Sequence, residues 1–377
     1  MENIEDFRKY IHANPELSGQ EKHTSAYTIE TLKKLGITEI HQGFSMYSFV
    51  VVINGKEKGA TVLFRCELDA LPIQEENSFQ HRSIHQGISH KCGHDGHLSI
   101  MLRFAQKLIE KPITKGKILL FFQSAEETGA GAKDAIASGI FKQFQINYAF
   151  ALHNLPSFPL HSILIKEKLF TPCVESGIFE LTGKTSHASE PQKGINPAIA
   201  IATIIQYFDT LTVSDKAHKN YFLSTPIHIT MGEKAYGVSA GKATIAYTFR
   251  TWENDTFEQI KTQIEQKVKQ IAEAHQLTLS INWVETFKAN NNHPDAYLQI
   301  KRAAQKLQMD IIELEKPFEF GEDFGLFTQQ YKGAMFGLGS GIDLSPLHSA
   351  DYDFPDELLE TGSEMFYQIA EQVLSID

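Results

Sequence analysis

Three predicted strands in this sequence each run directly into side chains that bind metal ions or carry protons. The strands and the side chains that follow them are residues 61–66 with Asp69, residues 117–122 with Glu126 and Glu127, and residues 148–152 with His153. Helical patterns separate these strands, as is typical of an α/β sheet. Open α/β sheets gather their ligands at the carboxyl ends of the strands. The recurrence therefore predicts an α/β fold with one shared site at an edge of its sheet.

A stretch of metal-binding side chains lies between the first two of these strands. Residues 90–97 hold a thiol, three imidazoles and a carboxylate, with two glycines that let the backbone turn tightly. Cys92 and His94 are spaced so that a loop running into a helix can aim both at one point. Thiolate and neutral imidazole suit zinc and the other late divalent metals. The stretch alone is compatible with a metal site or with a solvated loop, because it lacks the second ligand pair of a zinc-finger spacing.

The pattern of elements changes near residue 172. The elements that follow are a strand at 174–182, a helix from Asn196-Pro197 to about Leu211, strands near 226–231 and 242–250, a helix from about Asp255 and a strand at 277–286. This β-α-β-β-α-β order is typical of a ferredoxin-like sheet with two helices on one face. We therefore predict a catalytic domain formed by residues 1–172 and 288–377, with residues 173–287 inserted as a lid-like module.

Composition limits the classes of function. A chain of 377 residues is too long for one ordinary core, so two domains are expected. The formal net charge of -11 argues against nucleic-acid and anionic-membrane partners, which require basic surfaces. The start of the chain lacks the pattern of a signal peptide, and no apolar stretch is long enough to span a bilayer. Cys66, Cys92 and Cys173 do not form a disulfide pattern, so a cytoplasmic protein is predicted.

Seven motifs, taken together, resemble one family of metallo-amidohydrolases over nearly the whole chain. The motifs are Leu68-Asp69-Ala70-Leu71-Pro72, Cys92-Gly93-His94-Asp95-Gly96-His97, Gln123-Ser124-Ala125-Glu126-Glu127, Ser186-His187-Ala188, Phe249-Arg250-Thr251, Glu322-Asp323-Phe324 and Pro346-Leu347-His348-Ser349. Their order and spacing are similar to those of the aminoacylase, hippurate hydrolase and auxin-conjugate amidohydrolase branch of the co-catalytic metallopeptidases. The resemblance implies a di-metal exopeptidase-like catalytic domain, in which helices flank a mixed sheet, with an inserted ferredoxin-like α+β lid and dimerisation domain.

The resemblance also implies the metal ligands, which are Cys92, His94, Glu127, His153 and His348. They would hold two divalent metal ions per subunit. The chemistry of the residues agrees, because two adjacent ions need several ligands of mixed type around a bridging water or anion. Thiolate, imidazole and carboxylate together admit zinc, manganese, nickel or cobalt.

The remaining site residues are assigned by the same resemblance. Glu126, beside a ligand but not itself one, would take a proton from water and pass it to the leaving amine. Asp69 and Asp95 would orient ligand imidazoles through hydrogen bonds. His187 would stabilise the oxyanion of the tetrahedral intermediate, in its own subunit or across a homodimer.

Two further residues of the inserted module are candidates for substrate binding. Arg250 lies at a strand end, where a guanidinium can grip a substrate carboxylate with two hydrogen bonds or can be a surface arginine. Asn196 could contact the substrate or could cap the helix that follows it.

The sequence departs from the family pattern at a few positions. Glu67 stands where Asp is usual, Lys91 where a small residue is usual, and Gly321 where Ser is usual. Gly237-Val238-Ser239 replaces a stretch that contains Asn. The predicted ligands and Glu126 are all present, so these departures bear on substrate preference and leave the chemistry in place.

The predicted function is metal-dependent hydrolysis of a small-molecule N-acyl amino acid to a carboxylate and a free amino acid. The alternatives are a di-metal dipeptidase or carboxypeptidase, and a catalytically silent relative that binds metal or peptide. A serine hydrolase is also considered, because residues 237–241 match Gly-x-Ser-x-Gly, but that motif requires a following helix and a strand pattern follows here.

Overall fold

The computed structural model describes every residue except 1–2 and 376–377, so the outer ends of the predicted catalytic domain lie outside the described residues. The described chain forms two compact units. The first consists of the residues up to Phe170, Asn290–Phe318 and the residues from Glu322 onward, and the second consists of Thr171–Ala289 with Glu319–Gly321. The second unit therefore interrupts the first along the chain.

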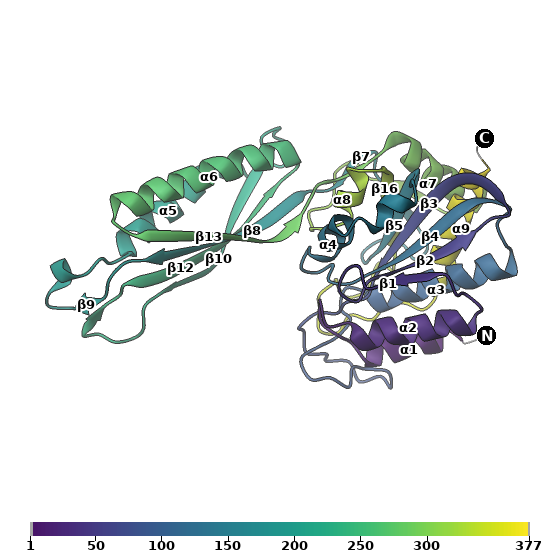
Figure 1. Ribbon diagram of the computed structural model, residues 1–377, viewed down its shortest axis with the longest axis horizontal. Helices are drawn as coiled ribbons and strands as arrows, with labels where there is room; N and C mark the ends of the chain where they lie inside the picture. The colour runs from purple at the N-terminus through teal and green to yellow at the C-terminus, as the bar shows by residue number, and fades with distance from the viewer. Residues whose placement is uncertain (1–2, 376–377) are drawn as a thin grey trace. The chain divides into compact units, whose positions relative to one another are not determined.

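An eight-stranded mixed sheet forms the centre of the first unit (Figure 1). In sheet order its strands are β1 (Ile40–Gln42), β2 (Phe49–Asn54), β4 (Lys115–Gln123), β3 (Glu57–Glu67), β5 (Tyr148–Leu155), β16 (Lys332–Gly339), β6 (Ile163–Ile165) and β15 (Ile311–Glu313). β4, β3, β5 and β16 are neighbours and run parallel, so their carboxyl ends share one edge. A separate pair joins β14 (Asn290–Asn292) with β7 (Lys168–Thr171).

Helices cover both faces of this sheet. On one face they are α1 (Ile4–Ala13), α2 (Lys22–Lys34), α3 (His94–Glu110), α7 (Pro294–Lys306) and α9 (Leu358–Leu374), and on the other α4 (Gly131–Ala137), the short 3₁₀ helix η1 (Ile140–Gln143) and α8 (Gly325–Thr328). Among the described residues, no helix is long and apolar enough to cross a membrane.

The position of β4 between two hydrophobic cores explains why its sequence is continuously apolar. Ile118 and Leu120 belong to the core beneath α3 and α9, whereas Leu119 and Phe121 belong to the core beneath α4 and α8. Successive side chains of a strand point to opposite faces, so a strand buried on both sides has no polar face. The apolar run therefore continues to the end of the strand, and the polar residues that follow it include Glu126.

Strand β5 is longer than the sequence predicts. The apolar pattern ends at residue 152, but the strand continues to Leu155, so His153 lies inside it and pairs with Gly337 of β16. Ladder hydrogen bonds use the backbone, so a polar side chain does not end the strand. His153 is consequently held by two neighbouring strands instead of by a loop.

The second unit is a four-stranded antiparallel sheet with two helices on one face (Figure 1). In sheet order its strands are β10 (Phe222–Met231), β12 (Lys242–Thr251), β8 (Cys173–Thr182) and β13 (Thr278–Phe287), and its helices are α5 (Ala198–Leu211) and α6 (Asn254–Ala274). A small pair joins β11 (Val238–Ser239) with β9 (Ser186–His187), and the 3₁₀ helix η2 spans Pro191–Lys193. This is the predicted ferredoxin-like arrangement. Residues 237–241 are followed by strand β12, so they do not form a nucleophile elbow.

A buried chain of charges attaches α1 to the start of α3. Arg8 donates to Asp95 at 3.0 Å, and the two ring nitrogens of His12 lie 2.8 Å from Asp95 and 3.0 Å from Glu75. Lys91 continues the chain by donating to Glu75 at 2.6 Å. Because both carboxylates accept from His12, its imidazole is doubly protonated. Burial alone would lower the pKa of His12, but Asp95 and the hydrogen bonds with Asp95 and Glu75 raise it to about 9.

We predict that His12 makes the stability of the protein depend on pH. Its pKa rises from an ordinary value of 6.5 to about 9 on folding, so its contribution is complete below pH 6.5 and is lost as the pH rises through 9. The free energy of unfolding of the wild type should fall by on the order of 1–3 kcal/mol more than that of His12→Gln across this window. Urea titration of both proteins between pH 6 and 9.5 measures the difference.

The comparison with His12→Gln isolates this titration from others in the same network. The charged or titratable groups that face or adjoin His12 are Arg8, Glu75, His81, His90, Lys91, Asp95 and Asp353, all of which the variant retains. A parallel decline in the two proteins would contradict the assignment.

Candidate metal centre

The predicted donors of the first unit gather at the carboxyl edge of its parallel strands. Asp69 follows β3, Glu126 and Glu127 follow β4, and His153 lies near the end of β5, with β3 between the other two strands. The start of α3 supplies the rest. Gly93 has a φ of 89°, a left-handed turn that suits glycine, and directly precedes the first residue of the helix, His94.

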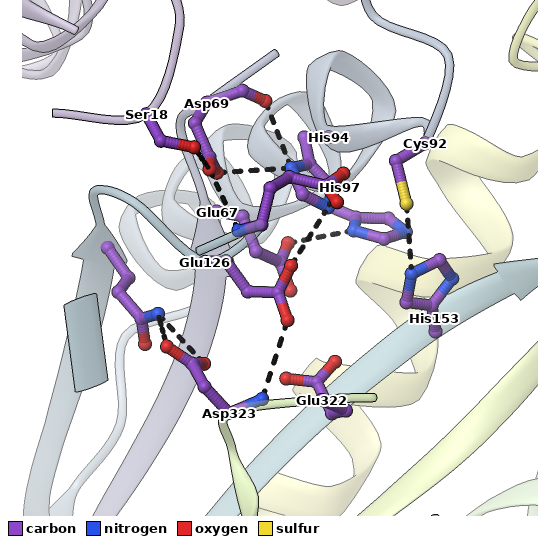
Figure 2. A network of polar contacts seen from close by, with 12 residues as sticks. Ser18, Glu67, Asp69, Cys92, His94, His97, Glu126, His153, Glu322 and Asp323 are labelled. Carbon is purple, nitrogen blue, oxygen red and sulfur yellow. Dashed lines mark hydrogen bonds and ion pairs between the residues drawn. The ribbon is translucent and has the colours of Figure 1, made fainter. Parts of the chain in front are cut away.

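Donor atoms from several residues converge at this edge, and most of them lie beyond hydrogen-bonding distance of one another. Cys92 Sγ lies 3.5 Å from His153 Nε2, a contact drawn in Figure 2. Glu127 Oε1 lies 3.8 Å from His94 Nε2, and Glu127 Oε2 lies 3.9 Å from His348 Nε2. Cys92, His94 and His153 form one group with donor atoms within 4.8 Å, and Cys92, Glu127 and His348 form another.

Backbone carbonyls fix the imidazoles of His94 and His153. The Nδ1 of His94 lies 3.0 Å from the carbonyl oxygen of Asp69, and the Nδ1 of His153 lies 2.9 Å from that of Asn154. A carbonyl only accepts, so each ring carries its proton at Nδ1 and presents Nε2 to the centre. The carboxylate of Asp69 adds a contact of 3.3 Å to His94 Nδ1, so it lies where the predicted orienting role requires it.

The unpartnered atoms at this edge fit a divalent cation. Within residues 3–375, His94 Nε2 and Glu127 Oε1 are buried without a hydrogen-bond partner. Such atoms are costly to bury unless something binds them. Burial and the Glu127 and Glu126 carboxylates also raise the pKa of the Cys92 thiol. A nearby divalent ion would reverse that shift, since a coordinating thiol loses its proton. The residues present therefore fit a metal centre.

His348 completes the donor set from a strained loop. Its φ is 66°, and its backbone N–H donates to the carbonyl oxygen of Lys91 at 2.7 Å. The Lys91 ammonium is fully buried and donates to Glu75, to Asn77 at 2.8 Å and to the carbonyl oxygen of Tyr352 at 2.7 Å. The unusual lysine next to Cys92 thus fastens the loop of His348 to the cysteine segment.

Glu126 lies beside the donors in a carboxylate-rich pocket. Its Oε2 lies 3.9 Å from His94 Nε2, and its Oε1 accepts the backbone N–H of Asp323 at 3.4 Å (Figure 2). Burial, and then the Glu322 and Asp323 carboxylates, raise the pKa of Glu126 well above its ordinary value. A carboxyl group tuned upward in this way can accept a proton and give it back.

The guanidinium of Arg65 holds these carboxylates together. It is fully buried at the end of β3 and donates to Glu322 at 2.8 Å, to Asp323 at 2.6 Å and to Glu67. Glu67 reaches onward to His97 Nδ1 at 2.8 Å. His97 Nε2 accepts the backbone N–H of Asn154, so both of its ring nitrogens are engaged within the fold.

Asp95 occupies a different position from the one predicted. Its carboxylate accepts from Arg8 and contacts His12, whereas the sequence predicts that it orients a ligand imidazole. Asp95 follows His94 on a helix, so its side chain points to another face and meets α1 instead. His90, at the start of the same stretch, is also buried, and burial lowers its pKa to about 4.

His187 and Asn196 lie close together in the second unit. His187 Nδ1 accepts the backbone N–H of Ser189, so a neutral ring carries its proton at Nε2 and can donate it to an oxyanion. Asn196 Oδ1 accepts the N–H of Ala198 at the start of α5, and its amide donates to Ser239 Oγ at 3.0 Å. Val238 pairs with His187 in the β11–β9 ladder. The helix-cap role of Asn196 is therefore present.

Arg250 lies on β12 of the same unit, paired with Leu223 and Val174. Within the part of the chain that the structure describes, its buried Nε has no hydrogen-bond partner. An arginine with an unused donor suits the predicted role of binding a substrate carboxylate.

Sequence reasoning missed Arg65 and Glu21. Arg65 interrupts an otherwise apolar strand, and a charge inside a buried strand is a signal that could have been followed. Glu21 gave no such signal, because it stands among the polar residues that begin α2. Its carboxylate nevertheless accepts the backbone N–H of Ala125, next to Glu126.

Comparison with known proteins identifies the family. Residues 63–372 match peptidase family M20/M25/M40. This chain belongs to that family. It is 32% identical over 364 residues to N-acetyldiaminopimelate deacetylase of Lactobacillus helveticus, covering 93% of this chain and 92% of the relative. It is 28% identical over 369 residues to hippurate hydrolase of Campylobacter jejuni, covering 97% and 95%. The predicted family is confirmed, and the chain is a hydrolase of this family.

Solved structures share the fold. The YXEP protein of Bacillus subtilis, a dinuclear metal binding peptidase, matches with a TM-score of 0.81 at 24% identity, over 98% of this chain and 97% of that one. The aminobenzoyl-glutamate utilization protein of Klebsiella pneumoniae matches with a TM-score of 0.77 at 15% identity, over 98% and 95%. The predicted mixed α/β fold is confirmed.

Proposed function

We propose that this M20-family protein hydrolyses the amide bond of N-acyl amino acids, releasing a carboxylate and a free amino acid. The observation that carries the proposal is the buried carboxylate of Glu126, to which we assign no ligand role, beside the two donor groups that share Cys92 and 3.9 Å from His94 Nε2. A purely structural metal site has no use for such a group. Relatives named hippurate hydrolase, N-acetyldiaminopimelate deacetylase and N-acetyl-L-cysteine deacetylase support the substrate class.

The proposed centre holds two divalent ions, with Cys92, His94, Glu127, His153 and His348 as ligands. The two donor groups, which share Cys92, support a pair of neighbouring ions. Divalent ions bound there supply Lewis acidity, which polarises a carbonyl and acidifies water. The mixed ligand set admits zinc, manganese, nickel or cobalt.

The residues of the chain divide the proton transfers. Glu126 accepts a proton from water as the water oxygen bonds to the acyl carbon, and it then delivers that proton to the amide nitrogen as the C–N bond breaks. The N–H at Nε2 of His187 stabilises the negative oxygen formed in between. Arg250 binds the carboxylate of the amino acid, which fixes the substrate end to end. The cytoplasmic location stays a prediction.

We predict that hydrolysis depends on metal and on the N-acyl group. Protein stripped with chelator should release no amino acid from N-acetyl, N-benzoyl or indoleacetyl amino acids. Reloading with manganese or zinc should restore amino-acid release from at least one of these substrates. A fluorogenic amine assay measures the release, and metal analysis measures the metal content before and after reloading. Release from dipeptides alone would move the assignment to a dipeptidase, and no release from metal-loaded protein would favour a binding protein.

We predict that Glu126→Gln lowers kcat by about 10²–10⁴-fold, since the amide cannot accept the proton. The metal content should equal that of the wild type, because Glu126 is not among the proposed ligands. Glu127→Gln is the matched control, and it should lose bound metal in plasma mass spectrometry. Full activity of Glu126→Gln would show that another group is the base.

We also propose a homodimer formed through the second unit. β10 is an edge strand of the four-stranded sheet. Its first residue, Phe222, pairs on the outer side with Val213, so the part of the strand beyond that bridge is the part proposed to pair with a second subunit. Apolar side chains gather on the same strand, with Ile227 62% exposed and Ile229 42% exposed. An exposed apolar edge strand is an aggregation hazard unless a partner covers it.

We predict that Ile227→Lys/Ile229→Lys converts the dimer into a monomer, because buried lysines would face one another across the symmetric contact. Sedimentation velocity at micromolar concentration measures the change. Ser280→Lys, on the opposite edge strand β13, is the control and should leave the dimer intact. A wild-type monomer at that concentration would refute the proposed assembly.

A further inference from the structure

The turn that carries Glu126 and Glu127 begins with a strained residue. Ala125 has a φ of 54°, a left-handed conformation that residues with a Cβ atom rarely adopt. It directly follows Ser124, just after β4, and so sets the direction in which the next two side chains leave the sheet. A residue in this region persists only when its surroundings hold it there.

Side chains from distant segments hold the backbone of this turn. Glu21 Oε1 accepts the N–H of Ala125 at 2.7 Å, and Ser48 Oγ accepts the N–H of Ser124 at 3.0 Å. Asp69 Oδ2 accepts the N–H of Glu127 at 3.0 Å. Of these contacts, the one from Glu21 falls on the strained residue itself.

Glu21 does not serve as an ordinary helix cap. It occupies the cap position of α2, but its side chain makes no capping hydrogen bond. The N–H groups of His23 and Thr24 are instead accepted by Glu16, at 3.1 and 2.7 Å. The Glu21 oxygen that binds Ala125 also accepts the N–H of Gly19 at 2.9 Å. The carboxylate therefore joins the loop before α2 to the turn after β4.

The burial of Glu21 is costly and needs a reason. The residue has no exposed surface, and its Oε2 is buried without a hydrogen-bond partner among residues 3–375. Burial raises its pKa to about 7, and the nearby Asp69 carboxylate adds to this shift. Ala125 is itself only 1% exposed, so its N–H would be an orphaned donor without Glu21.

We propose that Glu21 is a positioning residue that holds Ala125 in its left-handed conformation and thereby aims Glu126 and Glu127 into the metal centre. Glu21 lies outside residues 63–372, which match the family, and it touches no predicted ligand. The inference rests on the proposed function, since Glu126 is its general base. The role requires an acceptor at the end of a side chain of this length, whether charged or neutral.

The test compares substitutions at Glu21 in two backgrounds, the wild type and Ala125→Gly. Glu21→Met keeps the length but removes the acceptor, so kcat should fall by about 10²-fold from misplacement of Glu126. Glu21→Gln keeps an acceptor oxygen and should stay within about threefold of wild type. Glycine adopts a left-handed φ without strain, so the loss caused by Glu21→Met should shrink at least about tenfold in the Ala125→Gly background.

Two further measurements separate positioning from general damage. Hydrogen exchange of the peptide that contains Ala125 should accelerate in Glu21→Met but not in Glu21→Gln. Glu16→Ala, which removes the true capping contact of α2, should lower the melting temperature and leave kcat unchanged. If Glu21→Met does not fold, Glu21→Asp withdraws the acceptor by one methylene and should show the same dependence on Ala125→Gly.

An equal loss of kcat in both backgrounds would overturn the proposal, as would unchanged hydrogen exchange at Ala125. A wild-type protein that is inactive on every substrate would instead refute the proposed function, and the exchange measurement would still decide whether Glu21 holds the turn.

Discussion

The site depends on the compensation of buried negative charge. Glu67, Glu322 and Asp323 surround the guanidinium of Arg65, and Glu126 lies 4.0 Å from it. Buried carboxylates repel one another and lose their hydration, so they persist only with cations or protons nearby. One guanidinium cannot neutralise this group together with Glu127. The remaining negative charge is what makes this edge of the sheet attractive to divalent cations.

Contacts with the backbone orient two of the donors. His94 and His153 are held through Nδ1 by backbone carbonyls, one from Asn154 within β5 and the other from Asp69, two residues after the end of β3. The imidazoles therefore need little reorganisation on binding, which is the advantage of building a site on sheet edges. Glu126 lies outside the two donor groups that contain Cys92, and its carboxylate groups instead with His94 and Glu127.

Local patterns in the sequence predicted the parts of the site that lie along single strands. The strand ends at Asp69 and Glu126 follow from the apolar runs that precede them, and the family resemblance supplied His348. Contacts between distant segments could not be predicted in this way. Asp95 meets Arg8, 87 residues earlier in the chain, and nothing local to Asp95 indicates that partner. Strand β5 extends beyond its apolar pattern because backbone pairing with β16 determines where the strand ends.

The departures from the family pattern divide into two kinds. Lys91 is accommodated because its ammonium donates hydrogen bonds to Glu75 and Asn77. The side chain of Glu67, longer than the usual Asp, connects Arg65 to His97. The charged groups of both side chains have partners within the fold. These two residues therefore stabilise the centre and do not select the substrate. Ser239 differs, because its hydroxyl accepts from the amide of Asn196 on the ladder that carries His187. The Ser239 hydroxyl therefore connects Asn196, just before α5, to the β11–β9 ladder, a contact that lies wholly within the second unit.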